Sequence, residues 1–413
     1  MNKILPRYTK KVLFVHHFPD YSGAAESMLT LIRNLDPARY TASVLIVHPV
    51  SEPLLSAIRS MGIPVQHIST RLVWDSPWYS RENRQTGAWL AFRSDPQVSK
   101  YLCSERPDVV HINEFAPISV GYTAHELGIP VVWHCRHVLV YNRPILDPGQ
   151  RIIRAMVANA NIIICISEAE AALFPMAKTK VVYNPLNVAK IEAGRGQGET
   201  TRKSLGIETT DYVVTAPVLL SKSKGAWDFI RACGVASRLA PDVSMRFLLV
   251  GYLPTIGRRH LLRKWTGFLG PRSDLERAQN LARRLGIECR IQFTGFRSDI
   301  YAIMDGSDLI VFPSHLRACG RPCFEAGALQ KPIIVTLPNK NSGIVLDGKT
   351  GVILQEKAPD VLGKAIADLA HDRALSKRMG EQGYAHVCKN FDAVKHANNI
   401  MTIYDDICVK HKI

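Results

Sequence analysis

The segment from Asp308 to Thr336 combines a potential anion site with a carboxylate. The apolar run Leu309–Phe312 predicts a strand that is buried on both faces. Pro322 suits the first turn of a helix, where its missing N–H costs nothing. Free N–H groups at that helix end would attract an anion, and Glu325 lies about one turn further on. A carboxylate beside a phosphate-sized site indicates a ligand that carries both a phosphate and hydroxyl groups.

A second group of polar side chains ends the strand predicted over 129–135. His134 and Arg136 fall at its carboxyl end, where ligands of open parallel sheets bind. Glu114 ends the preceding strand in the same way and is a weaker candidate. A lone histidine is more often structural, so both interpretations of His134 stay open. Neighbouring strand residues point to opposite faces, which argues against a metal site around Cys135.

The scaffold for these residues is an alternation of strands and helices. The first half predicts strands near 10–18, 42–48, 63–68, 108–113, 129–135, 161–166 and 180–183, with helices near 51–61, 95–105, 118–127, 148–159 and 168–175. The second half continues with strands at 212–217 and 245–251 and a helix at 226–239. Such alternation predicts an α/β fold with parallel sheets covered by helices on both faces. A chain of 413 residues is long for one core and predicts two domains.

Composition limits the class of protein. The hydrophobic fraction of 46% and charged fraction of 21% are ordinary for a globular protein. No apolar run approaches the roughly 20 residues of a membrane span, and the first residues lack the apolar core of a signal peptide. These features predict a cytoplasmic protein. The nine scattered cysteines predict reduced thiols, and the spacing of Cys319 and Cys323 does not predict a zinc site.

The formal net charge of +16 indicates a polyanionic partner: nucleic acid, anionic lipid or a nucleotide substrate. No nucleic-acid-binding module is visible in the sequence, so we expect no nucleic acid partner. Two unusual segments can each be interpreted in two ways. Residues 70–95, rich in Trp and Arg, predict either a lid or a helix pair with its aromatic side chains packed inward. The basic segment 252–275 predicts either a surface for anionic membrane or a helical hairpin packed on the domain.

The order of these motifs resembles that of the retaining family 4 glycosyltransferases, which have the GT-B fold. The most specific matches are Pro313-Ser314, Gly320, Pro322, Glu325, Lys331-Pro332 and the stretch 343–351. The resemblance implies two Rossmann-like, doubly wound domains that face each other across a cleft. An acceptor-side domain would span 1–188 and a nucleotide-sugar domain 200–384, with 193–200 as linker. A C-terminal helix in 385–413 would pack back on the first domain.

The resemblance also implies a role for each matching residue. Lys224 would hold the diphosphate of a nucleotide-sugar donor and stabilise it as the leaving group, His134 would line the donor sugar, and Glu325 would contact the ribose. Donor-binding positions would further include Gly23, Arg136, Lys222, Phe296, Arg297, Arg317, Gly320, Arg321, Ser342 and Gly343. The turn at Gly23 could equally be an ordinary tight turn, and Lys222 an ordinary surface lysine. No cofactor or metal ion is implied.

Two positions depart from the family pattern. Leu219 stands where the family has an arginine, and Arg317 where it has the first of two glutamates. Arg317 could pair with an anionic donor sugar or with the diphosphate. The expected function is transfer of a sugar, with retention, to a cell-envelope glycan or a lipid-linked acceptor. The protein could act at an anionic membrane surface. The departures keep two alternatives open: a non-catalytic GT-B binding protein and a sugar-nucleotide epimerase.

Overall fold

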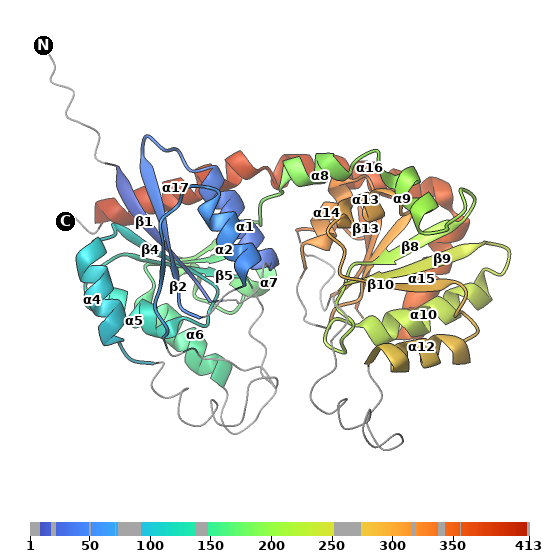
Figure 1. Ribbon diagram of the computed structural model, residues 1–413, viewed down its shortest axis with the longest axis horizontal. Helices are drawn as coiled ribbons and strands as arrows, with labels where there is room; N and C mark the ends of the chain where they lie inside the picture. The colour runs from blue at the N-terminus through green and yellow to red at the C-terminus, as the bar shows by residue number, and fades with distance from the viewer. Residues whose placement is uncertain are drawn as a thin grey trace, which may run out of the picture. The chain divides into compact units, whose positions relative to one another are not determined.

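The computed structural model describes residues 9–17, 22–48, 51–70, 72, 92–136, 148–251, 274–315, 319–337, 343–355 and 357–410. The chain forms two compact units. Unit 1 comprises Met1–Asn187 with Phe391–Ile413, and unit 2 comprises Val188–Asn390. Each unit contains one parallel β-sheet with helices on both faces (Figure 1). The predicted α/β class with two Rossmann-like halves is therefore confirmed.

The sheet of unit 1 has seven strands in the order β3-β2-β1-β4-β5-β6-β7. Their bounds are β1 Lys10–His16, β2 Tyr40–Ile46, β3 Val65–His67, β4 Val109–Asn113, β5 Val131–Cys135, β6 Ile162–Cys165 and β7 Thr179–Val181. Each predicted strand of this half is present, with its ends within two residues of the prediction. The chain order reverses between β1 and β4. In such sheets ligands bind beyond the carboxyl ends of the strands at this switch point.

Two apolar layers cover the sheet of unit 1. Val12 and Phe14 of β1 face a layer formed by α1 (Gly23–Arg33), α2 (Glu52–Arg59) and α17 (Ala393–Lys410). Leu13 and Val15 face the opposite layer, which contains α4 (Pro96–Glu105), α5 (Ile118–Glu126) and α6 (Pro148–Asn159). Successive strand residues point to opposite faces, so a strand covered on both sides must be apolar throughout. The short helix α7 (Glu168–Ala171) and a 3₁₀ turn at Met176–Lys178 follow β6.

The C-terminal helix α17 is part of the core of unit 1. Its Tyr404 hydroxyl lies 2.7 Å from Nδ1 of His111 in β4, and its Asp405 accepts a 2.6 Å hydrogen bond from the Tyr40 hydroxyl. Asp405 also forms ion pairs with Lys10 and Arg39. The preceding helix α16 (Arg373–Asn390) belongs to unit 2 as one continuous element. The predicted boundary at 385 falls inside it and is wrong; the return to unit 1 begins at Phe391.

Unit 2 has a six-stranded parallel sheet in the order β10-β9-β8-β11-β12-β13. The strands are β8 Tyr212–Ala216, β9 Met245–Val250, β10 Ile291–Gly295, β11 Leu309–Phe312, β12 Ile333–Thr336 and β13 Gly351–Leu354. Here the chain order reverses between β8 and β11, which pair directly. The carboxyl ends of these two strands are therefore the expected binding edge of unit 2.

The helices of unit 2 include α8 (Val188–Gly194), α9 (Gly198–Ser204), α10 (Ala226–Leu239), α12 (Asp274–Arg284), α13 (Ile300–Asp305), α14 (Pro322–Ala328) and α15 (Pro359–His371). The predicted linker over 193–200 is wrong, because α8 and α9 occupy most of it. A Cβ added to Gly194 would lie 2.5 Å from the Cβ of Tyr301, and one added to Gly198 would lie 2.6 Å from the backbone nitrogen of Gly306. These glycines permit close helix packing rather than chain flexibility.

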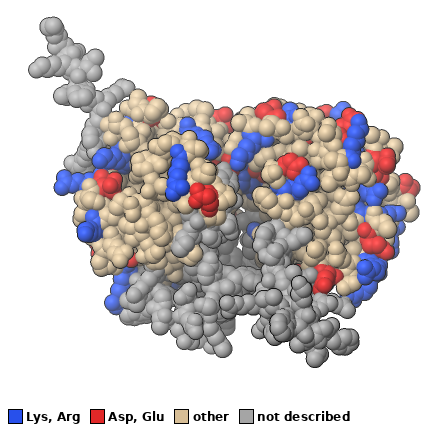
Figure 2. All heavy atoms as spheres, in the orientation of Figure 1, with Lys and Arg blue, Asp and Glu red and all other residues tan. Residues whose placement is uncertain are grey.

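Figure 2 shows how charged side chains are distributed on one face of the described residues. On the face shown in Figure 2, Lys and Arg side chains alternate with Asp and Glu over both units and form no single continuous patch. None of the helices in the described part of the chain combines the length and apolarity that crossing a bilayer requires. The segments 70–95 and 252–275 lie largely outside the described residues.

Candidate functional site

The turn that carries Lys224 connects β8 to α10 at the switch point of unit 2. Gly225 ends this turn with a φ of +72°, a conformation that L side chains rarely adopt. A Cβ added there would lie 1.8 Å from the carbonyl oxygen of Pro313, which follows β11. The backbone nitrogen of His315 donates to the Ser223 carbonyl at 3.0 Å. The loops after β8 and β11 are thus held against each other at the switch point of unit 2.

The Lys224 side chain is partly buried in this turn. Its ammonium makes no hydrogen bond or ion pair with any residue that the structure describes, and burial lowers its pKa. A cation removed from water without a partner is costly, and a bound anion would offset that cost. Asp228 nearby is engaged with His315, whose Nε2 lies 2.7 Å from the carboxylate. By contrast, Lys222 is exposed to solvent.

Glu325 lies in the first turn of α14, as predicted, and is 6% exposed. Its Oε1 accepts two hydrogen bonds, from Nε of Arg321 at 2.8 Å and from the Tyr301 hydroxyl at 2.9 Å. Upstream, a Cβ added to Gly320 would lie 2.5 Å from the ring of Phe312. Glycine is therefore required where this loop crosses the end of β11. The two donors fix the orientation of the Glu325 carboxylate before any ligand arrives.

Other donor-binding positions predicted in unit 2 have varied surroundings. Phe296 is 76% exposed just beyond β10. Arg297 donates to both carboxylate oxygens of Asp299, at 2.7 and 2.6 Å, and this pairing raises the pKa of Arg297. Gly343 has a φ of +64° and its carbonyl accepts from Nε2 of His386 at 2.9 Å. The predicted positions Arg317 and Ser342 lie outside the described residues.

In unit 1, predicted and unpredicted residues form one buried polar cluster at the carboxyl ends of β1, β4 and β5. Arg136, 5% exposed, donates from Nε to Oδ1 of Asn113 at 2.6 Å and from Nη1 to Oδ1 of Asn184. Its Nη2 lies 3.3 Å from Nδ1 of His134. The Asn113 amide nitrogen in turn lies 3.1 Å from Nδ1 of His16. Strand ends that meet at the switch point thus bring these residues together.

The histidines of this cluster are neutral at pH 7. Burial, reinforced by the positive charge of Arg136, lowers the pKa of His16 to about 3 and holds that of His134 well below its ordinary value. His134 is fully buried, and its Nε2 has no hydrogen-bond partner among the described residues. Because Nδ1 of His134 accepts from the donor-only guanidinium of Arg136, the proton of the neutral ring lies on Nε2, which can donate a hydrogen bond there. The fixed charge of the cluster is therefore that of Arg136.

Two further candidates border this cluster. Glu114 is fully buried with a φ of +95°, and its carbonyl accepts from Nε1 of Trp133 at 2.9 Å. A strained non-glycine residue at a strand end is more typical of functional sites than of ordinary turns. Gly23 is exposed at the start of α1, where Ser22 caps the helix through a 3.3 Å bond from the Ala25 nitrogen. The loop before it, 18–21, lies outside the described residues.

The stability of unit 1 is expected to fall as the pH drops below about 6.5. The pKa of His16 and that of His396 are both lowered to about 3 in the folded protein. On acidification the unfolded chain therefore takes up protons first, and the free energy of unfolding decreases until about pH 3. Thermal unfolding followed from pH 8 to pH 4 measures this slope.

The matched variant for this prediction is His396→Asn, which keeps a donor near the Tyr183 carbonyl that Nδ1 of His396 contacts at 2.8 Å. It is expected to flatten the pH dependence, whereas His67→Asn, at an exposed histidine of unit 1, is expected to leave it unchanged. An identical slope in both variants would show that His396 does not contribute.

Cysteines and metal ligands add no further site among the described residues. None of the nine cysteines, all of which lie in the described residues, forms a disulfide, and six of them are buried. The part of the chain that the structure describes contains no group of three or more His, Cys, Asp or Glu side chains able to hold a metal ion.

Two Rossmann-like sheets, each with polar residues at its switch point, are the arrangement of the GT-B fold class. The family model described as Glycosyltransferase Family 4 matches residues 21–190, and the model described as Glycosyl transferases group 1 matches residues 197–386. Together they cover most of the chain. The chain belongs to the family 4 glycosyltransferases.

Relatives and solved structures agree with this assignment. The chain is 26% identical to a D-inositol 3-phosphate glycosyltransferase of Corynebacterium glutamicum (strain R), over 79% of this chain and 77% of the relative. It is 25% identical to the UDP-Gal:alpha-D-GlcNAc-diphosphoundecaprenol alpha-1,3-galactosyltransferase of Escherichia coli, over 97% of both chains. Among solved structures, HepE of Anabaena in complex with UDP matches with a TM-score of 0.75 at 20% identity, over 96% of this chain and 100% of the other.

Proposed function

We propose that this protein transfers a sugar, with retention of its anomeric configuration, from a nucleotide-diphosphate sugar to a cell-envelope glycan or a lipid-linked acceptor. The observation that carries the proposal is the partly buried, unpartnered Lys224 ammonium at the switch point of unit 2. Donor diphosphate is an anion that would satisfy this cation. HepE, of similar fold, binds UDP according to its description.

In the proposed reaction, the bond between the anomeric carbon and the donor phosphate oxygen breaks. The acceptor hydroxyl forms the new bond on the same face of the sugar, and its proton passes to the departing diphosphate. Negative charge develops on that diphosphate, and Lys224 stabilises it electrostatically. Because the chain supplies this cation itself, we propose that transfer is independent of a metal ion. Glu325, already oriented by Arg321 and Tyr301, would accept hydrogen bonds from the ribose.

Two observations support the proposed acceptor class: the names of two relatives and the net charge of this chain. The Escherichia coli relative acts, by its name, on a sugar linked to diphosphoundecaprenol, and the Corynebacterium glutamicum relative acts on an inositol phosphate. Both acceptors carry phosphate, which suits a chain with a net charge of +16. A lipid-linked acceptor would place the protein peripherally on the inner face of the cytoplasmic membrane.

The decisive experiment incubates the purified protein with a panel of nucleotide-diphosphate sugars and with polyprenyl-diphosphate-linked sugars as acceptors. Release of nucleoside diphosphate should depend on the acceptor, and the product linkage, measured by NMR, should keep the configuration of the donor. An inverted linkage would exclude the retaining mechanism. Sugar isomers formed without acceptor would instead identify an epimerase. Donor binding without turnover under any condition would identify a non-catalytic binding protein.

A further inference from the structure

A pocket lies at the amino ends of the unit 2 strands, at the edge of the sheet opposite the turn that carries Lys224. It has a volume of about 210 Å³. Its lining residues come from the starts of β8, β11 and β12 and from the first turn of α16: Tyr212, Ser307, Asp308, Lys331, Arg373 and Lys377, among others. In a parallel sheet the amino and carboxyl ends form opposite edges. The pocket is therefore separate from the turn that carries Lys224.

Three cationic side chains line this pocket. Lys331 is partly buried, burial lowers its pKa, and its ammonium has no hydrogen-bond or ion-pair partner among the described residues. The Arg373 guanidinium contacts the Thr210 carbonyl at 3.4 Å and lies over the Tyr212 ring, 5.4 Å from its centroid. Lys377 lies 4.0 Å from Glu381 in an exposed pair, which screens its charge little.

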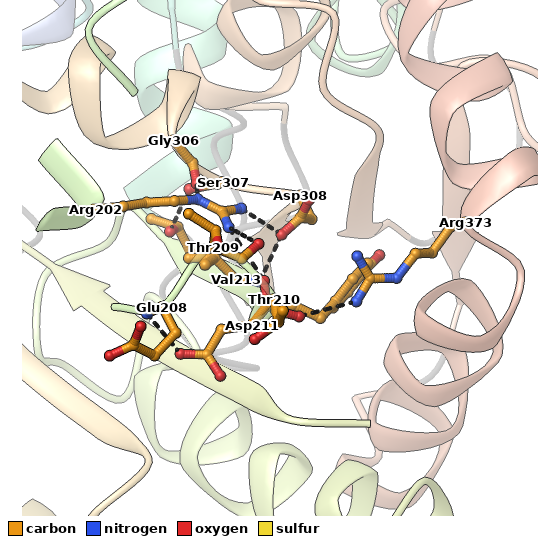
Figure 3. A network of polar contacts seen from close by, with 12 residues as sticks. Arg202, Glu208, Thr209, Thr210, Asp211, Val213, Gly306, Ser307, Asp308 and Arg373 are labelled. Carbon is orange, nitrogen blue, oxygen red and sulfur yellow. Dashed lines mark hydrogen bonds and ion pairs between the residues drawn. The ribbon is translucent and has the colours of Figure 1, made fainter. Parts of the chain in front are cut away.

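Asp308, a carboxylate that lines the same pocket, and Asp305 both act to raise the pKa of Lys331, but the effect of burial is larger and the pKa stays lowered. Oδ2 of Asp308 accepts hydrogen bonds from Nη2 of Arg202 at 2.6 Å and from the Val213 nitrogen at 2.8 Å. Figure 3 shows Arg202 and Asp308 joined in one network, with Arg373 on the other side of Asp308. Asp308 is thus compensated by a fourth cation, and the pocket keeps a positive balance.

We propose that this pocket binds the phosphate group of a small phosphorylated ligand. Phosphate oxygens would accept hydrogen bonds from Lys331 and Arg373, with Lys377 adding charge at the rim. Tyr212 and Ser376, whose hydroxyl groups share a hydrogen bond of 3.2 Å, leave one hydroxyl proton to donate from the wall. The volume is below the roughly 300–1,000 Å³ of pockets for drug-sized ligands. It suits a phosphate or a small phosphate ester rather than a nucleotide sugar.

A phosphate bound in this pocket would contact residues next to two helices of unit 2. Lys331 lies on the turn after α14, and Arg373 lies at the start of α16. The same helices meet where a Cβ added to Gly380 would lie 2.0 Å from the Gln330 carbonyl oxygen. A phosphate bound by both Lys331 and Arg373 stabilises this contact, because a ligand of the folded state alone raises its stability.

The test measures binding of inorganic phosphate by isothermal titration calorimetry, with chloride at matched ionic strength as reference. The full-length chain carries Lys224→Ala, so that phosphate cannot bind through the proposed donor site. Adding Lys331→Ala should weaken phosphate binding about tenfold or more, the effect of losing a charged hydrogen bond in a partly buried site. Lys364→Ala, at an exposed lysine on α15, is the matched control and should change nothing. Equal affinity in all variants, or no phosphate binding, overturns the proposal.

The phosphate group could belong to a soluble ester or to a lipid headgroup. Cosedimentation with phosphatidylcholine vesicles that contain phosphatidic acid distinguishes these sources. If Lys331→Ala weakens both calorimetric binding and cosedimentation, the ligand is a phospholipid; if it weakens only the former, the ligand is soluble. Vesicle binding that Lys331→Ala leaves unchanged, combined with no calorimetric signal, also counts against the pocket. Activity with nucleotide sugars plays no part in these readouts, so the outcome is independent of the proposed function.

Discussion

Replacing Lys224 by Ala is expected to lower kcat for sugar transfer about 10²–10³-fold, the usual effect of removing one preorganised group that stabilises developing charge. The loss should be this large because the ammonium is partly buried, and an interaction in a poorly hydrated site is screened less than one in water. The measurement is steady-state release of nucleoside diphosphate in the presence of acceptor.

Lys222→Ala is the control, since it removes an exposed lysine two residues away. It is expected to change kcat less than about threefold, in line with the small effects of exposed charges. Equal losses in both variants would show that Lys224 has no special role. The pH profile gives a second readout: because burial lowers the pKa of Lys224, activity should decline on the alkaline side at a lower pH than for an exposed lysine.

Gly225→Ala is expected to cost about 2–5 kcal/mol of the free energy of unfolding of unit 2. The left-handed backbone at Gly225 (φ +72°) penalises any L side chain by about 1–2 kcal/mol. The new Cβ would also lie 1.8 Å from the Pro313 carbonyl oxygen, and relieving such an overlap adds about 1–3 kcal/mol. Chemical denaturation monitored by circular dichroism measures the change.

The matched control is Gly206→Ala. Gly206 has nearly the same backbone, with a φ of +67°, but a Cβ added there would have no atom within 4 Å. It should therefore cost only the backbone penalty of about 1–2 kcal/mol. If both variants lose equal stability, the contact between the Lys224 turn and the end of β11 does not hold the two loops together. Donor affinity, measured with a nucleoside diphosphate, should fall only in Gly225→Ala.

The sequence predicted the architecture because its signals are local. A continuous apolar run such as Leu309–Phe312 indicates a strand covered on both faces, whatever surrounds it. The predictions that were wrong concern close packing. The glycines of 193–200 suggest a flexible connection by composition, yet Gly194 and Gly198 allow helices to approach one another. The neighbours that require a glycine lie about a hundred residues away, beyond the reach of a local pattern.

The sequence predicted the positions of the candidate site residues to about the same extent as it predicted the fold. Lys224, Glu325 and Gly320 follow strands, and the structure places them at the switch point of unit 2. Tyr301 escaped prediction because a tyrosine in a short apolar helix resembles a core residue, and only the fold brings its hydroxyl to Glu325. His16 offered a signal that could have been used, since it ends a strand as His134 does. The predicted donor contact of Arg297 gains no support from its surroundings, because its guanidinium pairs with Asp299.

The division of the chain has a practical consequence for protein engineering. Unit 2 is one uninterrupted stretch, Val188–Asn390, inserted between two portions of unit 1. A fragment cut after Asn187 loses α17 and with it the partners of Tyr40 and His111, which exposes to water the part of the apolar layer that α17 covers. To express unit 1 by itself, its own two pieces must be fused across a short artificial connector, whereas unit 2 can be excised by two cuts without dividing any helix.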